Sequence, residues 1–266
     1  MFEFNYVKAK SLADAQAIVA ANPEAKLLSG GMTLIPTLKQ RLAQPSHLVD
    51  IGGLPELCGI EVRNGQLVVG AASQHFEVAT SAVVRKAVPA LAALADQIGD
   101  PQVRNRGTLG GSVANNDPAA DYPAAVLALD ATIVTNKREI SAADFFQGMF
   151  ATALEDGEIV VRVRFNIPKR AAYEKFPHPA SGYAMAGSFV ADGTGGLRVA
   201  ITGAASGVFR WHEAEQALAK KLSVDVLEGV PLAMDNMNED IHATREYRAN
   251  LARVMTRRAV QKLLAA

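Results

Sequence analysis

Two glycine pairs, about 80 residues apart, constrain this chain more than any other feature of its sequence. The first lies within residues 29–33 (SGGMT) and the second within residues 108–112 (TLGGS). Consecutive glycines allow backbone N–H groups to point toward one ligand, which can then approach without meeting a Cβ atom. Neither segment carries a P-loop lysine or the G-x-G-x-x-G pattern of the Rossmann fold. Two such loops therefore predict a site for the diphosphate of a dinucleotide, in a fold other than the Rossmann fold.

The composition argues against several classes of function. The 266 residues are 49% hydrophobic, and 27 basic side chains balance 27 acidic ones. A neutral chain gives no electrostatic reason to expect nucleic acid or an anionic membrane surface as a partner. Cys58 is the only cysteine, so this chain alone cannot build a disulfide, an iron–sulfur cluster or a Cys-based zinc site. Neither an export signal nor a membrane-spanning apolar stretch is visible, so we expect a cytoplasmic protein.

The hydrophobic pattern predicts two α/β subdomains followed by a C-terminal domain. Residues 1–53 form a βαβ-like unit in which Ser11 caps the helix. Residues 54–168 begin with a hairpin at Asn64-Gly65 and continue through short helices to further strands. Residues 169–266 predict a three-stranded antiparallel sheet and then helices, the last of which is long.

No arrangement of side chains suggests a catalytic acid, base or nucleophile in this chain. The five histidines are isolated, and no G-x-S-x-G elbow is present. If the protein is an enzyme, we expect a cofactor to carry the difficult chemistry. The hydroxyls of Thr108 and Ser112 could donate to phosphate oxygens. Asp121 could accept from a ribose hydroxyl, or it could cap the helix that begins near Tyr122.

Lys175 lies in a predicted strand and has two interpretations. A solvent-facing lysine is the common case on a strand, and an inward lysine is costly unless an anion pairs with it. An inward ammonium placed over a flavin would stabilise negative charge on the reduced ring.

At these residues the chain resembles the FAD-binding medium subunits of molybdenum hydroxylases, most closely those of aerobic carbon monoxide dehydrogenases. It also resembles the flavin domain of xanthine dehydrogenase. The family's first loop usually reads A-G-G-H-S-L-I-P, where residues 29–36 read SGGMTLIP. Its second reads T-I-G-G-N or T-I-G-G-S and then D-P-A-A-D, where residues 108–112 and 117–121 read TLGGS and DPAAD. The resemblance spans nearly the whole chain, although Met32 replaces the family's usual histidine.

The resemblance implies a PCMH-type flavin fold of class α+β, in which two α/β subdomains hold FAD. It implies that the two glycine segments hold the pyrophosphate and that Lys175 lies near the isoalloxazine. The cofactor-binding residues that we expect are Leu28, Ser29, Gly30, Gly31, Met32, Thr33, Leu34, Thr108, Leu109, Gly110, Gly111, Ser112, Asn115, Asp121 and Lys175.

The resemblance also implies a function. We expect an FAD-dependent oxidoreductase subunit that takes electrons from an iron–sulfur subunit and passes them to an external acceptor, in a heterotrimer or its dimer. Molybdopterin and the two-iron two-sulfur clusters are expected only on the large and small partner subunits. One alternative is a stand-alone flavin-dependent reductase or oxidase on the same fold, which would need a proton donor beside the flavin. Another is a non-catalytic nucleotide-binding protein that has lost its flavin.

Overall fold

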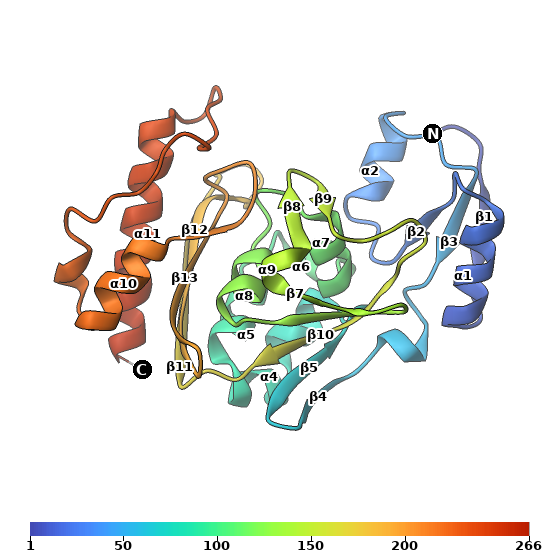
Figure 1. Cartoon of the computed structure of the whole chain (residues 1–266). Helices are drawn as coiled ribbons and strands as arrows, with labels where there is room; N and C mark the ends of the chain where they lie inside the picture. The colour runs from blue at the N-terminus through green and yellow to red at the C-terminus, as the bar shows by residue number, and fades with distance from the viewer. Residues whose placement is uncertain (266) are drawn as a thin grey trace.

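The N-terminal unit is a three-stranded parallel sheet with the strand order β1-β3-β2. The computed structural model describes residues 1–265 of the chain (Figure 1). The elements of this unit are β1 (Asn5–Lys8), α1 (Leu12–Ala21), β2 (Lys26–Leu28), α2 (Leu34–Lys39) and β3 (His47–Asp50). The predicted cap is confirmed, because the Ser11 hydroxyl accepts from the Asp14 amide. The first glycine pair lies between β2 and α2, just beyond the carboxyl end of a parallel strand.

The second subdomain is built on a five-stranded antiparallel sheet with the order β4-β5-β10-β6-β7. Its strands are β4 (Ile60–Arg63), β5 (Gln66–Gly70), β6 (Thr132–Thr135), β7 (Glu139–Ser141) and β10 (Val160–Asn166). The predicted hairpin joins β4 to β5, and both Asn64 and Gly65 have the positive φ that a tight turn of this kind requires. The strand β10 returns to the centre of the sheet and pairs with both β5 and β6.

Short helices pack around this sheet. They are η1 (Pro55–Leu57), α3 (His75–Thr80), α4 (Ala82–Ala87), α5 (Pro89–Asp96), α6 (Pro101–Arg104), α7 (Leu109–Asn115), α8 (Tyr122–Ala128) and α9 (Ala142–Phe145). A small hairpin of β8 (Phe146–Gly148) and β9 (Ala151–Thr152) follows. The second glycine pair, predicted as a loop, forms the first turn of α7 instead, because Thr108 caps that helix.

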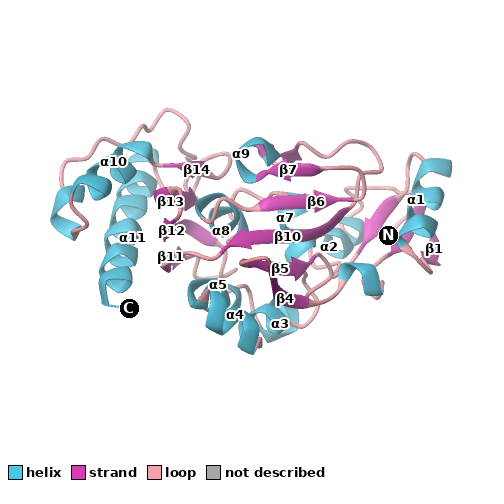
Figure 2. Cartoon of the chain, turned by 60° about the horizontal axis from the view of Figure 1, so that its bottom comes forward, coloured by secondary structure: helices cyan, strands magenta, loops and turns pink. Residues whose placement is uncertain are grey.

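The C-terminal part is an antiparallel sheet that is covered on its outer side by helices (Figures 1 and 2). Its elements are β11 (Arg170–Pro177), β12 (Ala184–Gly193), β13 (Gly196–Thr202), β14 (Phe209–Arg210), α10 (His212–Lys220), η2 (Val224–Leu227) and α11 (Arg245–Ala265). The sheet has four strands instead of the predicted three, since the two-residue β14 is too short to produce a sequence pattern. The predicted α+β class is confirmed.

The largest hydrophobic core crosses the domain boundary that we predicted after residue 168. It joins buried residues of β5, β10, α5 and α8 to Tyr173, Phe189 and Ala200 on the C-terminal sheet. The other face of that sheet packs against α10 and α11, and Trp211, the residue before α10, is fully buried in the same core. Both faces of the C-terminal sheet are therefore covered, one of them by the second subdomain. No helix in the described part of the chain is both long and apolar enough to cross a bilayer.

Candidate functional site

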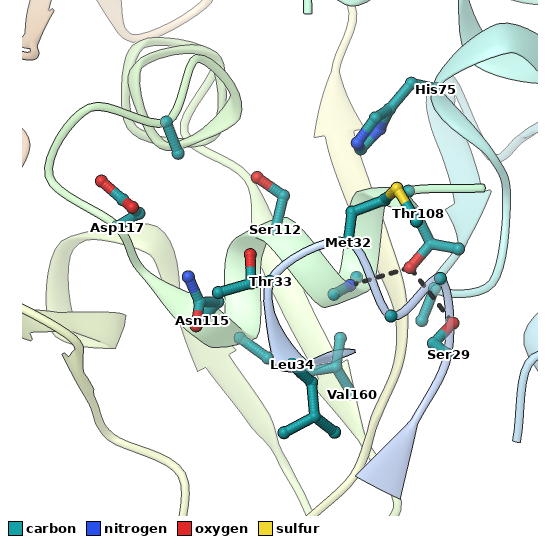
Figure 3. Close-up of a pocket in the computed structure, with 18 of the residues that line it drawn as sticks. Ser29, Met32, Thr33, Leu34, His75, Thr108, Ser112, Asn115, Asp117 and Val160 are labelled. Carbon is teal, nitrogen blue, oxygen red and sulfur yellow. Dashed lines mark hydrogen bonds between the residues drawn. The ribbon is translucent and has the colours of Figure 1, made fainter. Parts of the chain in front are cut away.

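The two glycine pairs meet at one cavity of about 640 Å³. Ser29 Oγ lies 3.2 Å from Thr108 Oγ1, and Figure 3 shows these hydroxyls bridging the two segments. A Cβ atom on Gly30 would lie 2.1 Å from the carbonyl oxygen of Arg106, so only glycine allows the two backbones to touch here. The cavity has the size of sites that enclose organic cofactors.

The first glycine pair leaves its backbone donors free. Within residues 1–265, the N–H groups of Gly30, Gly31, Met32 and Thr33 have no protein acceptor. All four residues line the cavity, and Gly31 has a φ of 72°, which favours glycine. Unpaired amide groups that cluster beside a cavity are suited to an anionic oxygen ligand, such as a phosphate of FAD.

The second glycine pair is built differently, because its amides are bonded to the protein. Thr108 Oγ1 accepts from the Gly111 N–H at 3.2 Å, and the Gly110 N–H donates to the Ala71 carbonyl at 2.9 Å. A Cβ on Gly110 would lie 2.4 Å from the Cβ of Ala71, so this glycine allows α7 to pack on the end of β5. We had expected both pairs to supply backbone donors, and for this pair that expectation is wrong. What it presents to the cavity instead is the hydroxyls of Thr108 and Ser112.

The structure brings most of the predicted residues together. Those that line the cavity are Leu28, Ser29, Gly30, Gly31, Met32, Thr33, Leu34, Thr108, Gly110, Gly111, Ser112, Asn115 and Asp121. Leu109 does not line it, because its side chain is buried in the core and its N–H donates to the Ser73 carbonyl at 2.9 Å. Lys175 does not line it either, and its surroundings explain why.

Lys175 is buried behind the cavity wall and holds Asp121. Its Nζ lies 3.0 Å from Asp121 Oδ1 and donates to the carbonyls of Gln97 at 2.8 Å and Gly182 at 3.0 Å. The Tyr173 hydroxyl donates to the same carboxylate at 2.5 Å. Burial raises the pKa of Asp121, and its bonds to Lys175 and Tyr173 oppose that rise. Lys175 is thus the inward, paired lysine of our two interpretations.

Asp121 does not cap α8 through its side chain. The segment that precedes α8, residues 117–121, is held by the C-terminal sheet. Thr202 Oγ1 donates to the carbonyls of Pro118 at 3.1 Å and Ala120 at 2.6 Å, and the Gly203 N–H donates to Pro118 at 2.8 Å. The C-terminal sheet therefore shapes one wall of the cavity, although its own strands lie outside it.

Glu158 is a cavity residue that sequence reasoning missed. Its side chain is fully buried and lies 3.1 Å from Arg138 Nε, and it also accepts from the Thr135 hydroxyl and the Glu155 amide. Burial alone would raise the pKa of Glu158, but these hydrogen bonds lower it to about 2. No local pattern indicates this pairing, because the partners come from different strands and turns.

Two ring side chains at the cavity were also missed. His75 is the first residue of α3, whose N-terminus is closed by a capping box between Gln74 and Glu77. Burial, with a smaller contribution from Arg104, lowers the pKa of His75 to about 4, so the imidazole is neutral near pH 7. Tyr183 precedes β12, lines the cavity and is 46% exposed. The sequence shows His75 only as an isolated histidine.

Comparisons with known proteins agree with this geometry. The family model described as the FAD binding domain in molybdopterin dehydrogenase matches residues 2–169. The carbon monoxide dehydrogenase medium chain of Hydrogenophaga pseudoflava is 34% identical, over 97% of this chain and 96% of the relative. The glyceraldehyde dehydrogenase medium chain of Sulfolobus acidocaldarius is 32% identical, over 98% of each chain. Among solved structures, reconstituted CO dehydrogenase from Oligotropha carboxidovorans aligns with a TM-score of 0.93 and 32% identity, covering 99% of this chain and 98% of that one.

Proposed function

The chain belongs to the family of FAD-binding domains of molybdopterin dehydrogenases, and from that premise we propose that it is the electron-transfer subunit of a molybdenum hydroxylase or dehydrogenase. It takes electrons from an iron–sulfur subunit and passes them to an external acceptor. A large subunit with molybdopterin oxidises the substrate, and the three chains form a heterotrimer or its dimer. With one cysteine, this chain cannot ligate a cluster, which agrees with clusters on a partner.

The observation that carries the proposal is the set of amides beside the cavity that have no acceptor among the described residues 1–265. The N–H groups of residues 30–33 and the hydroxyls of Thr108 and Ser112 can bind the diphosphate of FAD. Gly30 keeps the two segments in contact, and Asp121 is fixed by Lys175 at the cavity wall. FAD, when bound, supplies the reversible uptake of electrons, so this chain needs to bind and orient it and to control access to it.

The proposal is tested by purifying the complex through a tag on this chain. We expect a flavin absorption spectrum, release of FAD on denaturation, and co-purification of a cysteine-rich small chain and a large molybdenum-containing chain. Removing FAD should leave the iron–sulfur absorption intact but abolish reduction of a dye acceptor, and added FAD should restore it. Flavin without partner chains would favour a stand-alone flavoenzyme. A protein that binds no FAD would contradict the proposal and favour the non-catalytic alternative.

A further inference from the structure

The turn between β8 and β9 exposes two large apolar side chains. Met149 is 53% exposed and Phe150 is 57% exposed. Phe150 also has a φ of 54°, in the left-handed region that a bulky side chain rarely adopts. Strained backbone of this kind persists only where the surrounding structure enforces it, and it clusters at binding sites. Holding an aromatic ring in solvent on a strained turn is unfavourable for the chain alone, which points to contact with another molecule.

A buried asparagine fixes this turn to the cavity wall. Asn116 is 2% exposed and is the C-cap of α7. Its Nδ2 donates to the carbonyls of Gly148 at 2.8 Å and Ala151 at 2.7 Å, and its own carbonyl accepts from the Phe150 N–H at 3.1 Å. The residues before and after Asn116 both line the cavity. The turn is therefore held in place beside the cavity.

The turn belongs to a wider group of segments without charged side chains, which we call the uncharged rim. The rim consists of residues 146–154, 179–184 and 203–209, none of which is Asp, Glu, Lys or Arg, although 20% of the chain is charged. The cores of protein–protein interfaces are depleted of charged residues and enriched in Met and aromatic residues. With Met149 and Phe150 exposed on it, the rim has the composition of such a core.

The three segments of the rim lie side by side. A Cβ on Gly207 would lie 3.7 Å from the Cα of Gly148, and a Cβ on Gly203 would collide with the carbonyl of Ala184. Figure 1 shows the β8–β9 turn next to the loop that follows β13. Asp117 belongs to the adjoining loop, and its carboxylate accepts from a backbone amide of that loop at 2.8 Å. The rim is therefore one continuous surface.

The rim reaches the cavity through Tyr183. This residue belongs to the segment 179–184, lines the cavity and is 46% exposed. A molecule that covered the rim would therefore lie beside a cofactor bound in the cavity. Of the two partner subunits in the proposed complex, the iron–sulfur subunit is the one that must bring a redox centre close to FAD. The position of the rim thus favours this subunit over the large one.

We propose that the uncharged rim is the docking surface for the small iron–sulfur subunit, with Phe150 as the residue that contributes most to binding. The inference rests on the proposed function, because it requires FAD in the cavity and an iron–sulfur partner. A surface without charges is matched by an apolar face on the partner, since charged groups buried against it would stay unpaired. Contact of this kind depends on the burial of apolar surface, so we expect the complex to resist salt.

The first experiment identifies the chain that covers Phe150. In the full complex, Phe150 is replaced by the photocrosslinking residue benzoylphenylalanine, and Val62 is replaced in the same way as the control. Val62 is 50% exposed on β4, which lies at the bottom of Figure 1 while β8 lies at the top. Irradiation should link residue 150 to the cysteine-rich small chain, and residue 62 should not give this product. A link from residue 150 to the large chain or to a second copy of this chain, or no link at all, would overturn the inference.

The second experiment separates docking from folding. Phe150→Asn removes the aromatic ring, and asparagine tolerates the positive φ at this position, so urea unfolding of the chain alone should show no loss of stability. The affinity for the partner subunits, measured as dissociation of the purified complex on dilution, should fall about tenfold or more, as for a central aromatic residue of an interface. FAD content should be unchanged, and sodium chloride should not release the wild-type partners. Val62→Asn, which also removes an exposed apolar side chain, should change none of these properties.

The outcomes separate this inference from the proposed function. If Phe150→Asn binds the partner subunits as tightly as the wild type does, or loses stability to the same extent as affinity, the rim is not the docking surface and the proposed function stands. If the wild-type chain co-purifies with no iron–sulfur subunit, or binds no FAD, the proposed function itself fails and this inference fails with it.

Discussion

The two glycine pairs look alike in the sequence and do different physical work in the structure. In the described part of the chain, residues 1–265, the amides of residues 30–33 have no protein acceptor, so the first pair is a set of donors that can bind an anion. The second pair has its amides bonded to Ala71, just after β5, and to the Thr108 cap, and Gly110 allows α7 to pack closely. A glycine pair in a sequence therefore shows only that side chains are absent there. The neighbouring residues determine whether a ligand or another part of the protein fills the space.

The largest effect should come from the packing glycine. Gly110→Val places a branched side chain against Ala71, where even a Cβ would lie 2.4 Å away. We expect the free energy of unfolding to fall by roughly 3 kcal/mol or more, with loss of FAD as a consequence. Urea unfolding of the FAD-free protein measures the loss. Gly193→Val is the control, because a Cβ there meets no atom within 4 Å. If Gly110→Val kept normal stability and lost only FAD, the second pair would be a ligand loop like the first.

Acid should lower the stability of the protein through Glu158, which lines the cavity. Its pKa of about 2, against an ordinary 4.5, corresponds to roughly 3 kcal/mol of stability at neutral pH. Because the folded-state pKa is lowered, this contribution is present above pH 4.5 and is lost as the pH falls toward 2. Glu158→Gln should therefore be much less stable than the wild type at pH 7, and the two should converge near pH 2. A constant difference across this range would contradict the assignment. Glu155→Gln, which changes an exposed carboxylate, serves as the control.

Hydrogen exchange tests the comparison directly. In the FAD-free protein, the amides of Gly30 and Gly31 should exchange rapidly, and FAD should slow them by about 30-fold or more. The amides of Leu109 and Gly110 should be slow in both states, since they donate to the carbonyls of Ser73 and Ala71. Equal behaviour of the two pairs, in either direction, would break the distinction between them.

The smallest effect should follow from removing the helix cap. Thr108→Ala takes away the acceptor of the Gly111 N–H and should cost about 1 kcal/mol of stability, whereas Thr108→Ser should cost little. The variant also frees that amide, which makes the second pair chemically more like the first. Urea unfolding at pH 7 checks the cost. Ser29→Ala, which loses only the 3.2 Å hydroxyl contact, should be nearly neutral, and an equal loss in both variants would show that the cap is not the cause.

Local features of this site were predictable and distant pairings were not. The glycine segments, the Ser11 cap and the Asn64-Gly65 turn depend on residues close in the sequence, so their patterns identify them. The use of the Gly110 amide depends on Ala71, about 40 residues earlier. The pairing of Asp121 with Lys175 spans 54 residues and creates a buried ion pair that a strand pattern cannot show. Such contacts are set by how sheets meet, which hydrophobic periodicity does not encode.

The hydrogen bonds from the C-terminal sheet to residues 117–121 limit where this chain can be cut into separately folding fragments. A fragment that stopped near residue 169, where the family model ends, would keep the cavity-lining segment but lose Thr202, Gly203 and Lys175, which hold it. Asp121 would then be a carboxylate stripped of both its cation and its Tyr173 donor. The flavin module is therefore not portable at the point where its sequence signature stops, and chimeras that exchange it between subunits should carry the C-terminal sheet along.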